Sequence, residues 1–139
     1  MKAPLEKLGR EPKPTPLVQS QTFLLPWPIS TNRIWRNYAG QTILASEARN
    51  WTEHAGWLLK EQKARSIAGP VELKIELCSP HKRSYDISNR VKLLEDALVK
   101  FGIIEGDDSK IVQRLVVAVG DGFVGARVTL TPISGGENL

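Results

Sequence analysis

The clearest pattern along the chain is an alternation of apolar and charged residues at 71–78. This segment reads VELKIELC, with apolar side chains at positions 71, 73, 75 and 77 and charged ones at 72, 74 and 76. A period of two places each set on its own face of a strand. We therefore predict a half-buried strand here, after a turn at Gly69-Pro70. Cys78, the single cysteine, is expected to be a small buried hydrophobe.

Two segments show the three- and four-residue spacing of an amphipathic helix. The first is predicted to run from Ser46 to about Arg65, with one buried stripe formed by Ala48, Trp51, Ala55, Leu58 and Leu59. Trp51 and Trp57 are expected to be packing residues, with base stacking as the alternative. The second helix is predicted from Ile87 to Phe101, with Gly102 as its stop. Its apolar stripe would consist of Ile87, Val91, Leu94, Leu98 and Phe101, and its polar side would carry Asn89, Lys92 and Asp96.

The remaining elements are predicted to be strands. The first covers residues 22–25 and ends at Pro26 and Pro28, which cannot donate to a ladder. A loop or short helical turn with Arg33 and Arg36 exposed should follow, and then a short strand at 41–44. Strands at 109–119 and 123–131 are expected to be joined by a hairpin-type turn at 120–122. This order favours an α+β fold, a single small domain with a mixed sheet and two main helices packed on one face.

Composition is that of an ordinary soluble globular domain, with 139 residues, 41% hydrophobic and 24% charged. Residues 1–20 hold four of the nine prolines and few large apolar groups, so we predict a flexible N-terminal tail. The domain is then expected at 21–135 and a C-terminal tail at 136–139. The start of the chain lacks the apolar region of a signal peptide, and a cytoplasmic protein with no membrane association is expected.

The net charge of +4 is a weak argument for nucleic acid, because half of it belongs to the first twenty residues. Local clusters of cations are more informative. Lys82 and Arg83 lie in a basic loop, and Arg33 and Arg36 lie in another loop. Phosphate binding requires cations on exposed loops, so these four residues are candidate DNA contacts. A solvated surface is the alternative for each of them.

Acidic residues lie at both ends of the second predicted helix. Asp86 would be its N-cap, and Asp107 and Asp108 follow Gly106 in a turn after it. Capping and solvation are common roles for such residues. Together with Lys92 and the basic loop, however, they suit phosphodiester hydrolysis with Mg²⁺, which prefers carboxylate, phosphate and water oxygens. No HExxH, CxxC, P-loop or GxSxG motif occurs, so neither a nucleotide cofactor nor zinc-protease or esterase chemistry is indicated.

Three segments carry a resemblance to a known family: LPWPISTNRIWR, RSYDISNRVKLLEDAL and GDDSKIV. From about Thr22 to Thr131 the chain resembles the RusA family of Holliday junction resolvases, often encoded by phages and prophages. The resemblance implies a homodimeric, Mg²⁺-dependent endonuclease, with Mn²⁺ a possible substitute, that nicks four-way DNA junctions symmetrically. Asp86 matches the first acid of the family's DxDN motif, Asn89 its asparagine and Lys92 its helix lysine. Asp108 matches the later essential aspartate and Asp107 the neighbouring acid.

One position departs from the motif, because Ser88 stands where the family has its second aspartate. A hydroxyl is a poorer ligand than a carboxylate for a hard dication. Ser88 could lend its oxygen beside Asp86 and Asp108, Asp107 or Glu76 could substitute, or the protein could bind junctions and cut them poorly. We expect activity to be retained. The competing hypotheses are a DNA-binding module without catalysis and a globular protein with an unrelated ligand.

Overall fold

The central strand of the fold is β4 (Val71–Cys78), whose alternating sequence produces one apolar and one polar face. Its inward residues Val71, Leu73, Ile75 and Leu77 are completely buried. In the computed structural model, which describes residues 19–133, β4 pairs antiparallel with β6 (Gly125–Pro132) and parallel with β5 (Val112–Val119). With β1 (Gln21–Leu25) beside β6, the sheet has the order β1-β6-β4-β5. The predicted mixed sheet is confirmed.

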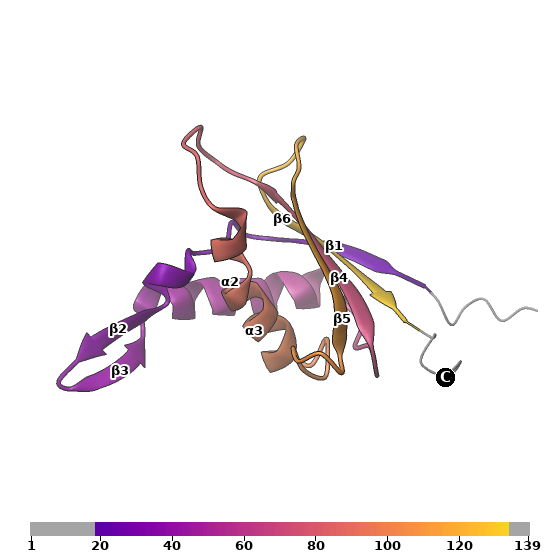
Figure 1. Cartoon of the computed structure of the whole chain (residues 1–139), viewed down its shortest axis with the longest axis horizontal. Helices are drawn as coiled ribbons and strands as arrows, with labels where there is room; N and C mark the ends of the chain where they lie inside the picture. Colours follow the sequence, from indigo (N-terminus) through magenta and orange to yellow (C-terminus); the bar gives the residue numbers. More distant parts are fainter. Residues whose placement is uncertain (1–18, 134–139) are drawn as a thin grey trace, which may run out of the picture.

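Two helices cover one face of this sheet (Figure 1). They are α2 (Ser46–Glu61) and α3 (Lys92–Lys100). Both contribute to one core with the inward side chains of the strands, which confirms the α+β architecture of a single small domain. No helix within residues 19–133 is both long and apolar enough to cross a membrane.

The long helix α2 confirms most of its predicted stripe. Trp51 is buried, and its indole Nε1 donates a hydrogen bond to the carbonyl of Pro26 at 3.1 Å. Trp57, in contrast, is 70% exposed, so the prediction that it packs in the core is wrong. The helix also ends at Glu61 rather than near Arg65, because Lys63 adopts a left-handed backbone with a φ of 59° and the N–H of Ala64 bonds back to the carbonyl of Leu59.

A second, two-stranded sheet was predicted only in part. A 3₁₀ turn, η2 (Thr31–Arg33), leads into β2 (Trp35–Tyr38), which pairs with β3 (Gln41–Leu44). The predicted short strand and helical turn are therefore confirmed, whereas the loop between them is a strand. This hairpin projects away from the main sheet (Figure 1). The turn at Ala39 and Gly40 has positive φ at both residues, as tight hairpins require.

The predicted hairpin between the last two strands is wrong. β5 and β6 are not neighbours, because β4 lies between them and bonds to both. The connection must therefore cross over the end of β4. At its far end Gly125 has a φ of +117°, and a Cβ there would lie 2.4 Å from the carbonyl oxygen of Leu25, so only glycine fits.

Other expectations have mixed outcomes. Cys78 is a free thiol that is only partly buried, so its description as a core residue is too strong. Residues 1–18 and 134–139 lie outside the described part of the chain, and they include most of the predicted N-terminal tail (1–20) and all of the predicted C-terminal tail (136–139).

Candidate active site

The segment expected to be one helix from Ile87 to Phe101 is divided in two. Residues Ile87–Arg90 form a 3₁₀ turn, η3, and the α-helix begins only at Lys92. Asp86 precedes η3 as its N-cap residue, but its side chain makes no capping hydrogen bond. At the other end Phe101 is 39% exposed and does not complete the predicted buried stripe. The prediction of a continuous helix, and of a single polar face along it, is therefore wrong.

Contacts with the chain before β2 explain the division. The hydroxyl of Thr31 donates to the carbonyl of Asn89 at 3.0 Å, which occupies a group that a continuous helix would use itself. Arg90 donates from Nη1 to the carbonyl of Pro28 at 2.8 Å. Its guanidinium lies over the rings of Trp27, 5.0 Å from the centroid, and Tyr85, 6.0 Å from it. These interactions hold η3 against the loop that carries Arg33.

The side chains of the DxxN segment are available at the surface. Asp86 and Ser88 are exposed, and Asn89 is half-buried. The backbone N–H of Asn89 donates to the backbone carbonyl of Asp86 at 3.1 Å. This bond fixes the turn through the main chain and does not use the Asp86 carboxylate. η3 also lies against β5, the strand that follows the second acidic cluster.

Lys92 joins the start of α3 to that second cluster. Its Nζ is 3.2 Å from the Asp96 carboxylate, one helical turn on, and 3.5 Å from the Asp107 carboxylate. Hydrogen bonding to Asp96 is the main cause that raises the pKa of Lys92, and Asp107 adds to it. Lys92 therefore remains a cation at neutral pH and is not suited to act as a base.

Negative charge exceeds positive charge around this lysine. Glu95, Asp96 and Asp107 supply three carboxylates against one ammonium. Burial raises the pKa of Glu95, and the charges of Asp107 and Asp96 raise it further, while Lys92 opposes them. The excess of carboxylates makes this region attractive to a cation.

Asp108 shapes the turn that enters β5. Its side-chain oxygen accepts the backbone N–H of Lys110 at 2.9 Å, and its carbonyl accepts from Ile111 and Val112. Asp108 remains exposed, and one of its carboxylate oxygens bonds within the turn, while no hydrogen bond within residues 19–133 engages the other.

The oxygen donors of this site are of the chemical type that a hard divalent ion prefers, although they are few. Asp86, Asp107 and Asp108 offer carboxylate oxygens, and Ser88 a hydroxyl oxygen, as Mg²⁺ prefers. Within residues 19–133 no three His, Cys, Asp or Glu side chains cluster as a ready-made metal site. Mg²⁺ commonly uses only one or two carboxylates with water and phosphate, so two acids suffice.

Glu76, the other possible substitute ligand, is engaged elsewhere. Both of its carboxylate oxygens accept hydrogen bonds from Arg127, at 3.0 and 3.2 Å, on the outer face of the sheet. The bond to Arg127 lowers the pKa of Glu76. The geometry therefore favours Asp107 over Glu76 as a substitute for the missing aspartate.

The candidate cations lie on two exposed segments. Lys82 and Arg83 belong to the loop between β4 and η3, which extends well beyond the sheet and the helices (Figure 1). Arg33 ends η2 and pairs with Glu47, and it is close enough to Arg90 to help lower the pKa of that residue, which burial lowers most. Arg36 is exposed on β2.

Sequence reasoning missed the residues that position η3. Arg90, Trp27, Tyr85 and Thr31 hold this turn, yet they come from two segments that are far apart in the sequence, residues 27–31 and 85–90. The one available signal was the arginine directly after Asn89, in the segment ISNR.

The sequence matches a known family of proteins. The sequence model of the family described as endodeoxyribonuclease RusA matches residues 26–131. A relative in Escherichia coli strain K12, a crossover junction endodeoxyribonuclease RusA, is 32% identical over 101 residues, which cover 72% of this chain and 83% of the relative. The enzyme of the same name from Enterobacteria phage 82 is 34% identical over 94 residues, covering 67% of this chain and 78% of the relative.

Proposed function

Because the chain belongs to the RusA family of endodeoxyribonucleases, we propose that it resolves four-way DNA junctions by symmetric paired nicks in a Mg²⁺-dependent reaction. The curated relatives are named for cleavage of crossover junctions, and they span most of the described domain. Endonuclease activity follows from the family. The metal, the symmetry of cleavage and the residue roles are what we propose beyond it.

The contact between Lys92 and Asp107 is the observation that supports this proposal most. It links the start of α3, directly after the Asp86–Asn89 turn, to the turn that contains Asp108. The two acidic segments are separated by about twenty residues of sequence, and this ion pair brings their neighbours together. Since the pair is exposed, it contributes about 0–1 kcal/mol to stability at most. Stability therefore does not explain the arrangement.

Asp86 and Asp108 would hold the Mg²⁺ ion, with Ser88 and Asp107 as further oxygen donors. When bound, Mg²⁺ would activate a water molecule and offset charge on the scissile phosphate. Lys92, a cation at neutral pH, would lie beside the same phosphate and stabilise the negative charge that develops there. Asn89 would orient the segment that carries Asp86 through the hydrogen bond from its backbone N–H to the carbonyl of Asp86.

DNA would be held by the cations around these residues. Lys82 and Arg83 lie on the loop that extends beyond the sheet and the helices, and Arg33 and Arg36 lie on η2 and β2, at the start of the projecting hairpin. Contacts of this kind position a backbone without reading sequence. Binding is therefore expected to weaken strongly with salt.

Ser88 leaves a second function open, namely junction binding with weak cleavage. The serine removes one charge from the ligand set. The surplus of carboxylates around Lys92 favours retained activity, because Asp107 lies close enough to that cluster to replace the missing charge.

A homodimer is expected for a two-fold substrate, and β5 is the surface that fits a second copy. β5 is an edge strand that pairs only with β4 among the strands at 19–133. Its apolar residues Leu115 and Val119 remain 46% and 69% exposed. Exposed apolar edges favour strand addition. Antiparallel pairing of β5 with its copy across a two-fold axis would cover them and place the two acidic turns in one assembly.

Replacement of either proposed ligand should abolish cleavage. We expect Asp86→Asn and Asp108→Asn to reduce nicking of a synthetic four-way junction by about 100-fold or more, since each removes a charged ligand. Asparagine at 108 can still accept the Lys110 N–H, so the fold should persist. DNA affinity, measured by gel shift, should be unchanged or higher. Asp121→Asn, at an exposed carboxylate on the β5–β6 connection, is the matched control. Persistent nicking in both variants would refute the assignment.

Restoring the family's carboxylate should strengthen metal use. Ser88→Asp is expected to raise the rate of junction cleavage or to lower the Mg²⁺ concentration needed for half-maximal rate, because it adds a charged ligand. Cleavage rates across a Mg²⁺ titration would show either effect. If both quantities stay unchanged, Ser88 does not contact the metal.

The proposed dimer can be tested at the β5 edge. Leu115→Lys should convert a two-chain species into single chains in sedimentation velocity, because a buried charge at the centre of the interface is costly. Leu24→Lys, at an exposed apolar residue of the opposite edge strand β1, should leave the dimer intact. A wild-type protein that sediments as a single chain at micromolar concentration would contradict the dimer.

A further inference from the structure

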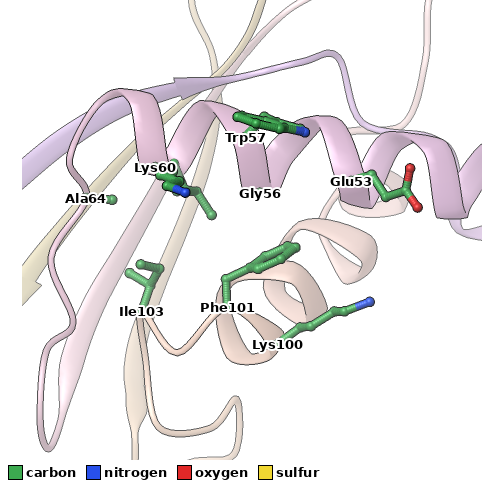
Figure 2. A pocket seen from close by; sticks show the side chains of 9 residues that line it. Glu53, Gly56, Trp57, Lys60, Ala64, Lys100, Phe101 and Ile103 are labelled. Atoms are coloured by element: carbon green, nitrogen blue, oxygen red, sulfur yellow. The ribbon is translucent and has the colours of Figure 1, made fainter.

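A groove between α2 and α3 is unrelated to the proposed metal ligands. Its volume is about 520 Å³, and its floor is apolar, formed by Leu59, Ala64 and Ile103. Trp57 of α2 and Phe101 at the end of α3 provide its aromatic walls (Figure 2). This volume and this apolar, aromatic lining lie within the range of small-molecule sites.

Gly56 determines how closely the two helices approach in this groove. A Cβ at position 56 would lie 2.5 Å from Cζ of Phe101, so the phenyl ring rests directly on the backbone of α2. Phe101 therefore has a fixed support, although it is 39% exposed. Trp57, one residue on, is 70% exposed, a large apolar area for a residue with no structural role in the core.

Each aromatic ring is accompanied by a lysine. Nζ of Lys60 lies 5.8 Å from the centroid of Trp57, and Nζ of Lys100 lies 5.8 Å from the centroid of Phe101. Within the described residues 19–133 neither lysine forms an ion pair. Glu53 is the one carboxylate at the rim, so the groove has a net positive charge.

We propose that this groove binds an unpaired nucleobase of single-stranded DNA, a proposal that rests on the proposed function for its substrate class. The base would stack in the groove against Trp57 and Phe101, and the phosphates on either side would lie beside Lys60 and Lys100. Aromatic platforms with flanking cations are the usual means of binding single strands, and every base offers a face for stacking. An apolar peptide would use the rings and the floor but would gain nothing from the two cations.

The position of the groove suits a strand that also reaches the acidic site. Lys92 and Lys100 begin and end α3, so they are about 12 Å apart along the helix at a rise of 1.5 Å per residue. At the duplex rise of about 3.4 Å per nucleotide this span corresponds to at most three or four nucleotides of one strand, and to fewer in an extended single strand. The groove would then bind an unstacked base a few nucleotides from the phosphate next to Lys92, as at the centre of a branched substrate.

The test uses the full chain and a fluorescein-labelled oligothymidine of eight nucleotides, with EDTA present so that cleavage plays no part. Fluorescence anisotropy should show binding that Trp57→Leu weakens about tenfold, since stacking contributes on the order of 1–3 kcal/mol per base. Trp57→Phe, which keeps an aromatic face, should lose less than about threefold. Lys60→Met should reduce the salt dependence by about 0.7 in the logarithmic slope. Val124→Ala, at an exposed apolar residue that does not line the groove, should have no effect.

Three outcomes would overturn the proposal. Equal affinity of Trp57→Leu and Trp57→Phe would show that the groove does not stack a base. The same result accompanied by a change in oligomeric state on Trp57→Leu would identify a second copy as the occupant. A wild-type protein that nicks junctions but does not bind the oligonucleotide would refute the groove alone. Oligonucleotide binding through Trp57 without junction cleavage would instead refute the proposed function alone.

Discussion

The parallel pairing of β4 with β5 is the constraint on which the candidate site depends. Two parallel neighbours cannot be joined by a tight turn, so a crossover of many residues must lead from the end of one strand to the start of the other. Residues 79–111 form this crossover, and they include every proposed ligand as well as Lys92. The crossover starts at the end of β4 and ends at the start of β5, and these two strands are paired in the sheet. The sheet therefore holds both ends of the segment that carries the acidic residues.

The alternating and helical patterns of the sequence predicted what local periodicity controls. β4 and most of α2 were found where expected, because each carries a periodic apolar face. The sequence could not predict the division of η3 from α3, which depends on Thr31 and on the stacking of Arg90 against Trp27. Nor could it place β4 between β5 and β6, since pairing partners are chosen by tertiary packing.

The candidate site was predicted both from the residue pattern and from the family motif. The acids at 86, 107 and 108 and Lys92 were singled out because they lie around the second predicted helix, and the resemblance assigned their roles and that of Asn89. The structure adds the contact between Lys92 and Asp107. The structure also identifies Asp96 as a second partner of Lys92. It argues against Glu76 as a substitute metal ligand, because Glu76 is bonded to Arg127. Trp57 shows the limit of spacing arguments, because its place beside a buried stripe predicted packing and its side chain faces solvent.

The central claim is that Asp86 and Asp108 hold one divalent ion together. Mn²⁺ binding to the full chain, followed by electron paramagnetic resonance of the free ion, tests this without reference to cleavage. The account predicts one site per chain in the wild type, with affinity reduced about tenfold or more by Asp86→Asn and equally by Asp108→Asn, while Asp121→Asn retains it. Unchanged Mn²⁺ affinity in either ligand variant would contradict a shared ion.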